Sequence, residues 1–416
     1  MRILASAIFL LLAPLALGAQ EVGVEPQPTT GEPLKVSLIT IGQGDRIWER
    51  FGHNALMIEN EETGYKRFFN WGVFSWDEEG FYPRLFRGTM LFRLDSSDPE
   101  TALMGYQREG RPVWIQELFL TPFQRQELLA LVQENDLPEN RYYRYDYYRD
   151  NCSTRVRDML DRVLDGQLET LFSAHTMETT FRWHTRRLLK ELPLSYLGIQ
   201  FVLGPRSDHF LTAWEEMFLP MRLMSLVQDV QVPDGEGGVR SFATEEKVLL
   251  DPGRSDPPSA PPFALPLFLA VGLLWGGGLL WLAGTGSGLG AGRRLGVSLL
   301  ACGWSLVAAV AGSLMLVAWL FTDHVFWYQN FNLLQANPLS FAVSVAFPLF
   351  LVRGRFPRWG RDFAVGVALI SVMGFAVELL PGLGQGNSEI LPLTLPVNLS
   401  VGAVTARLYQ KASKPS

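Results

Sequence analysis

Residues 142–164, YYRYDYYRDNCSTRVRDMLDRVL, pass from a tyrosine-rich run into a helix pattern, with a cysteine at the junction. The tyrosine-rich part predicts an extended segment, whereas the apolar residues after the cysteine recur at helical spacing. Asp150 and Asn151 are good N-cap residues, which places Cys152 in the first turn. Unpaired backbone N–H groups and the helix dipole favour a thiolate there. The stretch therefore predicts a nucleophilic cysteine.

A cysteine nucleophile needs a general base, and His53 is the candidate for that role. It stands in residues 51–58, FGHNALMI, where a strand is expected to begin. A third group usually orients the imidazole, and Asn70 is our candidate because it ends the neighbouring strand of a predicted hairpin. Asn151 or a backbone carbonyl are the alternatives. Without catalysis, His53 would be an edge-strand histidine and Cys152 a small buried hydrophobe.

The first half of the chain predicts an α+β domain with an antiparallel sheet and helices, over residues 34–170. A threonine followed by a proline, Thr121-Pro122, is expected to begin a helix. An aromatic-rich helical extension (171–250) and a linker rich in Gly, Pro and Asp (251–262) follow. The strands are expected at residues 34–41, 55–59, 65–70 and 111–119.

The chain carries signals for export and for membrane insertion. Residues 1–18 have the charge, apolar stretch and small-residue site of a signal peptide. Residues 263–406 predict a transmembrane domain of about five helices, since each span needs roughly 20 apolar residues. Basic clusters after alternate spans place the N-terminal domain outside. The spans are expected at 263–282, 295–321, 333–352, 363–380 and, more weakly, 390–406.

Composition narrows the remaining functional classes. The net charge of −6 and the lack of a basic stripe argue against nucleic-acid binding. Two cysteines exclude a disulfide framework. The spacing of His175, His184 and His209 fits no compact metal motif, so we expect no metal and no other cofactor.

A second polar group lies in the loop between the second and third predicted spans, on the same side as Cys152. It comprises Asp323, His324, Asn330 and Asn332, beside several aromatic residues. Polar groups at the end of a span are candidates for function, here the binding of a lipid headgroup or an acceptor amine. The alternative is an interfacial aromatic belt with polar caps. Asn151 is a further candidate for substrate binding.

Several motifs resemble a known family. A histidine strand followed by a cysteine helix resembles circularly permuted papain-like thiol hydrolases, such as relatives of lecithin–retinol acyltransferase and permuted NlpC-type amidases. More closely, the chain resembles the extracytoplasmic domain of the bacterial Lnb family, which is fused to membrane spans. The matching stretches are RFGHN (50–54), FNWG (69–72) and YDYYRDNCSTR (145–155).

The resemblance implies a permuted papain-like fold, with Cys152 as nucleophile and His53 as base. It also implies a role in N-acylation of lipoproteins. We therefore expect a membrane-anchored cysteine acyltransferase of the bacterial inner membrane, with its N-terminal domain in the periplasm. Its partners would be a phospholipid acyl donor and a lipoprotein acceptor. The alternatives are a thiol lipase or amidase of the envelope, and a non-catalytic membrane scaffold.

Overall fold

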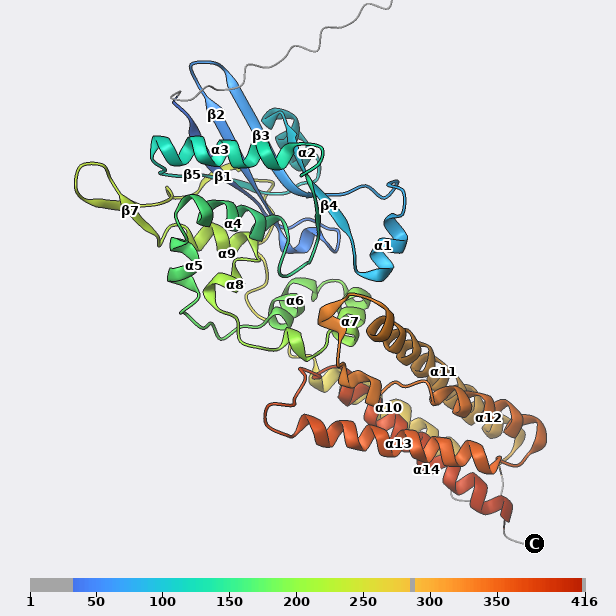
Figure 1. The fold of residues 1–416 in the computed structure, drawn as a ribbon. Coiled ribbons are helices and arrows are strands. Elements are labelled where there is room, and N and C mark those ends of the chain that lie inside the picture. The colour runs from blue at the N-terminus through green and yellow to red at the C-terminus, as the bar shows by residue number, and fades with distance from the viewer. Residues whose placement is uncertain (1–32, 285–288, 414–416) are drawn as a thin grey trace, which may run out of the picture.

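The computed structural model describes residues 33–284 and 289–413. The predicted signal peptide (1–18) lies outside the described residues. An α+β domain stands at one end of a bundle of long helices (Figure 1). Its seven-stranded sheet has the order β6-β4-β3-β2-β1-β5-β9 and is antiparallel throughout. The strands are β1 (Lys35–Ile41), β2 (His53–Asn60), β3 (Tyr65–Val73), β4 (Leu91–Ser97), β5 (Val113–Glu117), β6 (Tyr142–Arg144) and β9 (Lys247–Leu250).

The predicted hairpin is confirmed and sets the geometry of the site. Strands β2 and β3 pair antiparallel, with Leu56 opposite Phe69 and Asn60 opposite Tyr65. Because successive side chains of a strand point to opposite faces, Leu56 faces one core and Met57 the other. Because the two strands run in opposite directions, the start of β2 lies beside the end of β3, at the open end of the hairpin.

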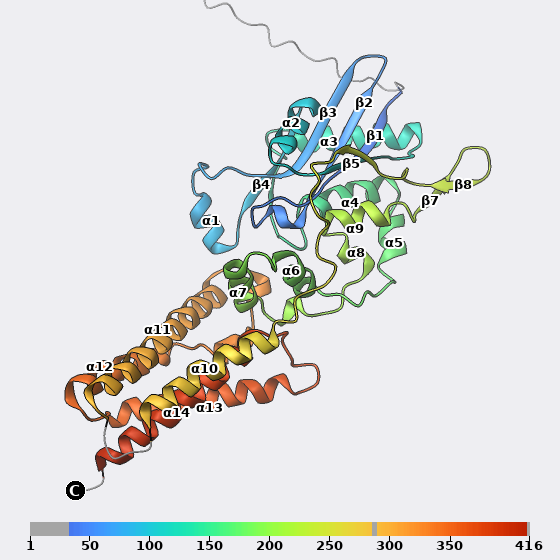
Figure 2. The same cartoon turned by 180° about the vertical axis from the view of Figure 1, so that it is seen from behind.

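Helices cover both faces of this sheet. On one face lie α3 (Pro122–Asp136) and α4 (Cys152–Val163), where Val156 and Leu160 are fully buried. On the other face, α2 (Pro99–Arg108) packs against β3 (Figure 2). Burying one large aliphatic side chain contributes about 1.5–3 kcal/mol. The buried face of α4 therefore fixes its start against the β2–β3 hairpin.

Two local predictions concern helix and strand boundaries. The Thr121 side chain and Gln124 form a reciprocal capping box at the start of α3, as the Thr-Pro signal indicates. The extended run predicted over 142–148 is wrong after Arg144, because the Asp146 carboxylate accepts hydrogen bonds from the backbone N–H groups of Tyr148 and Arg149, both at 2.9 Å. This side-chain turn ends the strand and brings the chain back to start α4.

The segment after residue 170 completes the N-terminal domain. Strand β9 pairs with β5 at the sheet edge, and Met217, Leu223 and Phe242 are buried in the same core as α4. The elements of this segment are α5 (Gln167–Phe172), α6 (Phe181–Leu189), α7 (Pro193–Val202), α8 (Ala213–Glu216), α9 (Pro220–Leu226), and the hairpin of β7 (Gln231–Pro233) and β8 (Val239–Ser241).

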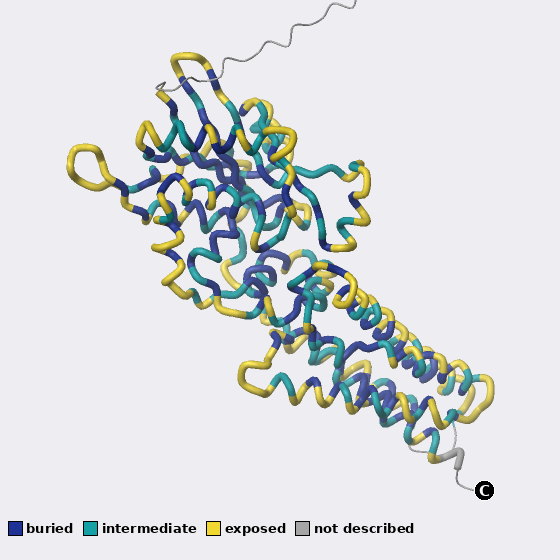
Figure 3. The backbone as a smooth tube through the Cα atoms, viewed as in Figure 1, coloured by how far each residue is buried: buried dark blue, intermediate teal, exposed yellow. Residues whose placement is uncertain are grey.

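Among the described residues, five apolar helices form the C-terminal bundle, and four of them are long and apolar enough to cross a membrane. The third predicted span is shorter than expected, because residues 331–339 are not α-helical and only 14 residues remain in its helix. The outer faces of the bundle are widely exposed (Figure 3), as lipid-facing surfaces require. The helices are α10 (Leu265–Ala283), α11 (Ala291–Phe321), α12 (Ser340–Arg353), α13 (Arg358–Glu378) and α14 (Ile390–Ser413).

Candidate active site

The side chains of His53 and Asn70 meet at the open end of the β2–β3 hairpin. The two residues are the first of β2 and the sixth of β3, and the imidazole Nε2 is hydrogen-bonded to the Asn70 Oδ1. An amide oxygen can only accept, so this bond places the proton on Nε2. The other ring nitrogen, Nδ1, is then left to exchange a proton with a neighbouring group.

That neighbouring group is the thiol of Cys152. Burial disfavours its ionisation, but the charge and hydrogen bond of His53 outweigh burial, helped by the backbone N–H groups of Asn54 and Ser153. The pKa of Cys152 therefore lies below its usual value. The residue is nevertheless partly exposed. A partly accessible thiol with a lowered pKa is typical of a reactive cysteine.

Gly72 leaves room for the side chains of Cys152 and His53 to approach each other. The β3–β4 register shifts between Trp71 and Val73, which leaves Gly72 in a bulge with φ of 88°. A Cβ atom at this position would lie 3.4 Å from the Cys152 Cβ and 3.9 Å from the His53 Cε1. Bulges of this kind often occur beside active sites, where they redirect a strand. A side chain here would fill the space next to the sulfur and strain the backbone.

The start of α4 is held by hydrogen bonds to a distant segment. Asn151 accepts from the N–H groups of Ser153 and Thr154, and its amide donates to the carbonyls of Tyr147 and Phe218. The Ser153 hydroxyl lies 2.6 Å from the Met217 carbonyl oxygen. Both the acceptor and the donors of Asn151 are thus engaged within the protein. Its role as helix N-cap was predicted, whereas its predicted contact with substrate gains no support from this placement.

Two tyrosines complete the site, and sequence reasoning did not single them out. The Tyr143 hydroxyl is buried without a hydrogen-bond partner and lies 3.8 Å from the ideal Cβ position at Gly72. The Cys152 charge acts on this hydroxyl, and burial raises the pKa of Tyr143 well above its ordinary value. On the other side, the Tyr106 side chain of α2 lies near Asn70; burial raises the pKa of the tyrosine, and the amide of Asn70 lowers it less strongly. Both tyrosines belong to aromatic-rich regions, where such residues usually pack in the core. Composition alone therefore gave no indication that they lie at the active site.

The loop residues predicted to bind substrate instead join the two domains. Asn330 and Asn332 donate to the carbonyls of Val202 and Phe201, at 2.8 Å each, and so cap the C-terminal end of α7. Helix ends leave four carbonyls without intrahelical partners, and these amides satisfy two of them. The structure does not bring either asparagine to Cys152.

Asp323 and His324 contact the helix α1 (Phe81–Arg87). The Asp323 carboxylate pairs with Arg144 at 2.9 Å, and the His324 Nε2 lies 3.0 Å from the Leu85 carbonyl oxygen. The His324 ring also stacks on Trp327, at 4.0 Å between centroids. Their placement favours a role in docking the membrane loop onto the N-terminal domain.

A buried ion pair also joins the domains. The Glu389 carboxylate, at the start of the last helix, accepts from Arg186 of α6 at 2.6 Å and from the Tyr196 hydroxyl at 2.5 Å. Glu389 is fully buried, so removing Arg186 would leave an uncompensated charge. The N-terminal domain is thus held in one orientation on the bundle.

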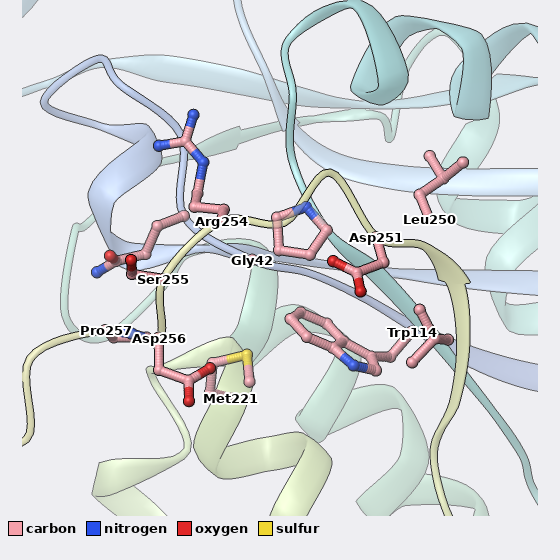
Figure 4. A pocket seen from close by; sticks show the side chains of 12 residues that line it. Gly42, Trp114, Met221, Leu250, Asp251, Arg254, Ser255, Asp256 and Pro257 are labelled. Atoms are coloured by element: carbon pink, nitrogen blue, oxygen red, sulfur yellow. The ribbon is translucent and has the colours of Figure 1, made fainter.

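A cavity of about 230 Å³ lies elsewhere, between the start of β5 and the linker (Figure 4). Trp114 and Met221 line it together with Asp251, Arg254 and Asp256 of the linker, and none of the cysteine–histidine site residues does. Within residues 33–284 and 289–413, no group of three or more His, Cys, Asp or Glu side chains is placed to hold a metal ion.

The fold and the site together define a membrane protein whose N-terminal α+β domain carries a cysteine–histidine–asparagine arrangement. Two family models match the chain: the Lnb N-terminal periplasmic domain over residues 29–191, and the Lnb transmembrane domain over residues 266–411. The chain therefore belongs to the Lnb family, as the motifs around His53 and Cys152 predicted. Comparison with curated proteins and with solved structures found no match.

Proposed function

We propose that the protein is a cysteine acyltransferase that moves an acyl chain from a phospholipid to an amine. The observation that carries the proposal is the contact between the Cys152 thiol and the His53 ring, which lowers the pKa of the thiol. A thiolate paired with an imidazole is the machinery of acyl transfer through a thioester. The membrane helices favour a lipid donor, because donor and enzyme then share one bilayer.

In the first half-reaction, the Nδ1 of His53 holds the proton taken from the thiol, and the Cys152 thiolate attacks the ester carbonyl of the phospholipid to form a tetrahedral oxyanion. His53 gives the Nδ1 proton to the leaving alcohol oxygen as the C–O bond breaks. A lysophospholipid departs, and the acyl chain remains on the sulfur as a thioester. The Tyr143 hydroxyl, buried beside the sulfur without a partner, supplies a donor for the oxyanion.

In the second half-reaction, an amine attacks the thioester carbonyl while His53 takes up the amine proton. The C–S bond then breaks, the amide product leaves and the thiolate returns. The proposed acceptor is the N-terminal amine of a lipoprotein, which also lies at the membrane surface. Asn70 holds the imidazole through both steps, because its Oδ1 is bonded to the Nε2.

We also infer that the chain lies in the inner membrane of a bacterium, with the N-terminal domain in the periplasm. The family name of that domain is periplasmic, and four helices are suited to cross the bilayer. The start of α11 and the ends of α12 and α14 lie remote from the N-terminal domain (Figure 1). Arg293, Arg353 and Arg407 belong to these helix ends, which agrees with the positive-inside rule.

The test is mass spectrometry of lipoprotein N-termini from cells that carry the intact protein or its Cys152→Ser variant. N-acylated termini with the intact protein alone support the proposal. Unchanged termini would remove the transferase assignment. Release of free fatty acid by the purified protein without an acceptor would instead indicate a thiol lipase, and activity that survives Cys152→Ser would indicate a scaffold.

A further inference from the structure

Helix α1, the segment before it and Trp48, whose ring contacts Trp76 at 5.6 Å, expose an unusual number of aromatic side chains for a water-facing surface. Tyr82 and Phe86 are 63% and 61% exposed, and Trp48 and Trp76 are each nearly half exposed. Tyr82 and Phe86 are four residues apart and share one face of the helix. We call these four residues the aromatic patch. Contiguous exposed apolar groups usually mark a surface that binds a partner or a membrane.

The patch is fixed close to the outer end of a membrane-spanning helix. The Asp323 N–H donates to the Arg87 carbonyl at 2.7 Å, and the His324 ring contacts the Leu85 carbonyl. Asp323 follows the end of α11 at Phe321 by two residues, which reach at most about 7 Å. The end of α1 therefore lies next to the end of a helix that is long and apolar enough to cross a membrane.

Gly88 makes this contact possible. Its φ is 73°, and a Cβ atom at this position would lie 2.8 Å from the backbone nitrogen of His324, closer than real Cβ contacts allow. The backbone of α1 and that of the membrane loop are thus packed directly against each other. Since the contact is between main chains, the distance of α1 from the bilayer does not depend on a flexible side chain.

The patch continues inward as a row of rings that leads to the core against which Cys152 packs. Trp76 contacts Phe74 at 5.3 Å, Phe74 stacks on Phe92 at 4.8 Å, and Phe92 stacks on Tyr145 at 4.1 Å. Tyr145 and Cys152 pack against the same hydrophobic core. A lipid held at the patch is therefore on the same apolar side of the domain as the thiol.

We infer that the aromatic patch inserts into the outer leaflet of the bilayer that holds α10–α14. Aromatic rings are enriched at the lipid–water boundary, where an apolar body meets polar headgroups. Arg87 is exposed beside the patch and suits an anionic headgroup, whereas Arg84 is paired with Glu78 at 3.0 Å. A further step, in which the inserted patch admits the acyl donor, rests on the proposed function. The insertion itself does not.

The test places an environment-sensitive fluorophore on single cysteines in the full-length chain, with Cys152→Ala and Cys302→Ala removing the native thiols. Variants Phe86→Cys and Tyr82→Cys are labelled with a nitrobenzoxadiazole dye and reconstituted into phosphatidylethanolamine–phosphatidylglycerol vesicles. Leu314→Cys on the lipid-facing side of α11 is the membrane control. Phe123→Cys is the matched aqueous control, since it is 76% exposed on α3, on the far side of the domain from the bundle.

Labels at both patch positions are expected to shift to shorter emission wavelength, to be quenched by spin-labelled lipid and to resist iodide, as at Leu314→Cys. Quenching by iodide, as at Phe123→Cys, would overturn the inference. A patch label that becomes protected only when a purified lipoprotein is added would also overturn it, in favour of a protein partner.

A second measurement separates insertion from catalysis. In vesicles, Phe86→Asp is expected to raise the KM for the phospholipid donor about tenfold, equivalent to about 1.4 kcal/mol. Labelling of Cys152 by soluble iodoacetamide should proceed as in the parent protein, which shows that the fold is intact. If the parent protein transfers no acyl group, the proposed function fails, and the fluorescence result still decides insertion. An unchanged KM would contradict admission of the donor at the patch.

Discussion

Replacing His53 with alanine tests the thiolate at the centre of the site. In the structure, burial opposes ionisation of Cys152, and the imidazole is the largest influence acting against burial. His53→Ala removes this influence and leaves the burial. The pKa of Cys152 should therefore rise, and the thiolate fraction at neutral pH should fall.

The magnitude follows from the ionised fraction. A thiol with an ordinary pKa near 8.5 is only about 3% ionised at pH 7, so full ionisation increases the thiolate about thirtyfold. A thiolate of lower pKa is also a weaker nucleophile, which offsets part of this gain. We expect His53→Ala to slow alkylation of Cys152 at pH 7 by about tenfold.

The assay measures the rate of iodoacetamide labelling between pH 5 and 9 in the Cys302→Ala background, with peptide mapping of the product. His175→Ala is the matched control, because His175 is an exposed histidine whose ring bonds the Leu171 carbonyl. The rate profile should move to higher pH in His53→Ala and stay in place in the control. Coincident profiles for the parent protein and His53→Ala would refute the pairing of thiol and imidazole.

Three further substitutions separate positioning, oxyanion stabilisation and structure. Asn70→Ala should slow thioester formation about a hundredfold with little change in KM. Asn70→Asp should restore part of the rate, because a carboxylate oxygen can orient the ring as the amide oxygen does. Equal loss of rate in both variants would contradict this role. Tyr143→Phe should lower kcat by about 10²–10³-fold while thermal stability is kept, and an unaltered kcat would exclude the hydroxyl as an oxyanion donor. Asn151→Ala removes an N-cap and leaves two carbonyls unpaired, so the free energy of unfolding should fall by about 2–4 kcal/mol. A normal denaturation midpoint with a raised KM would instead support substrate binding by Asn151.

Local patterns were sufficient for several parts of the structure. The N-cap at Asn151 and the Thr121 capping box depend on residues within one helical turn, so the sequence predicts them directly. The β2–β3 hairpin is also local, and its register brings Asn70 next to His53, as predicted. The apolar spans likewise depend on composition over consecutive residues. These features need no knowledge of distant contacts.

The remainder of the site was decided by contacts between segments far apart in the chain. Tyr143 faces Cys152 because β6 joins the sheet beside β4 and a bulge leaves Gly72 without a side chain, and no local pattern states either fact. Asn330 and Asn332 read as ligand-binding groups in a polar loop, but they cap a helix about 130 residues away. An amide has the same chemistry in both roles. What it binds is determined by which backbone groups the fold leaves unpaired nearby, and only the tertiary structure specifies those.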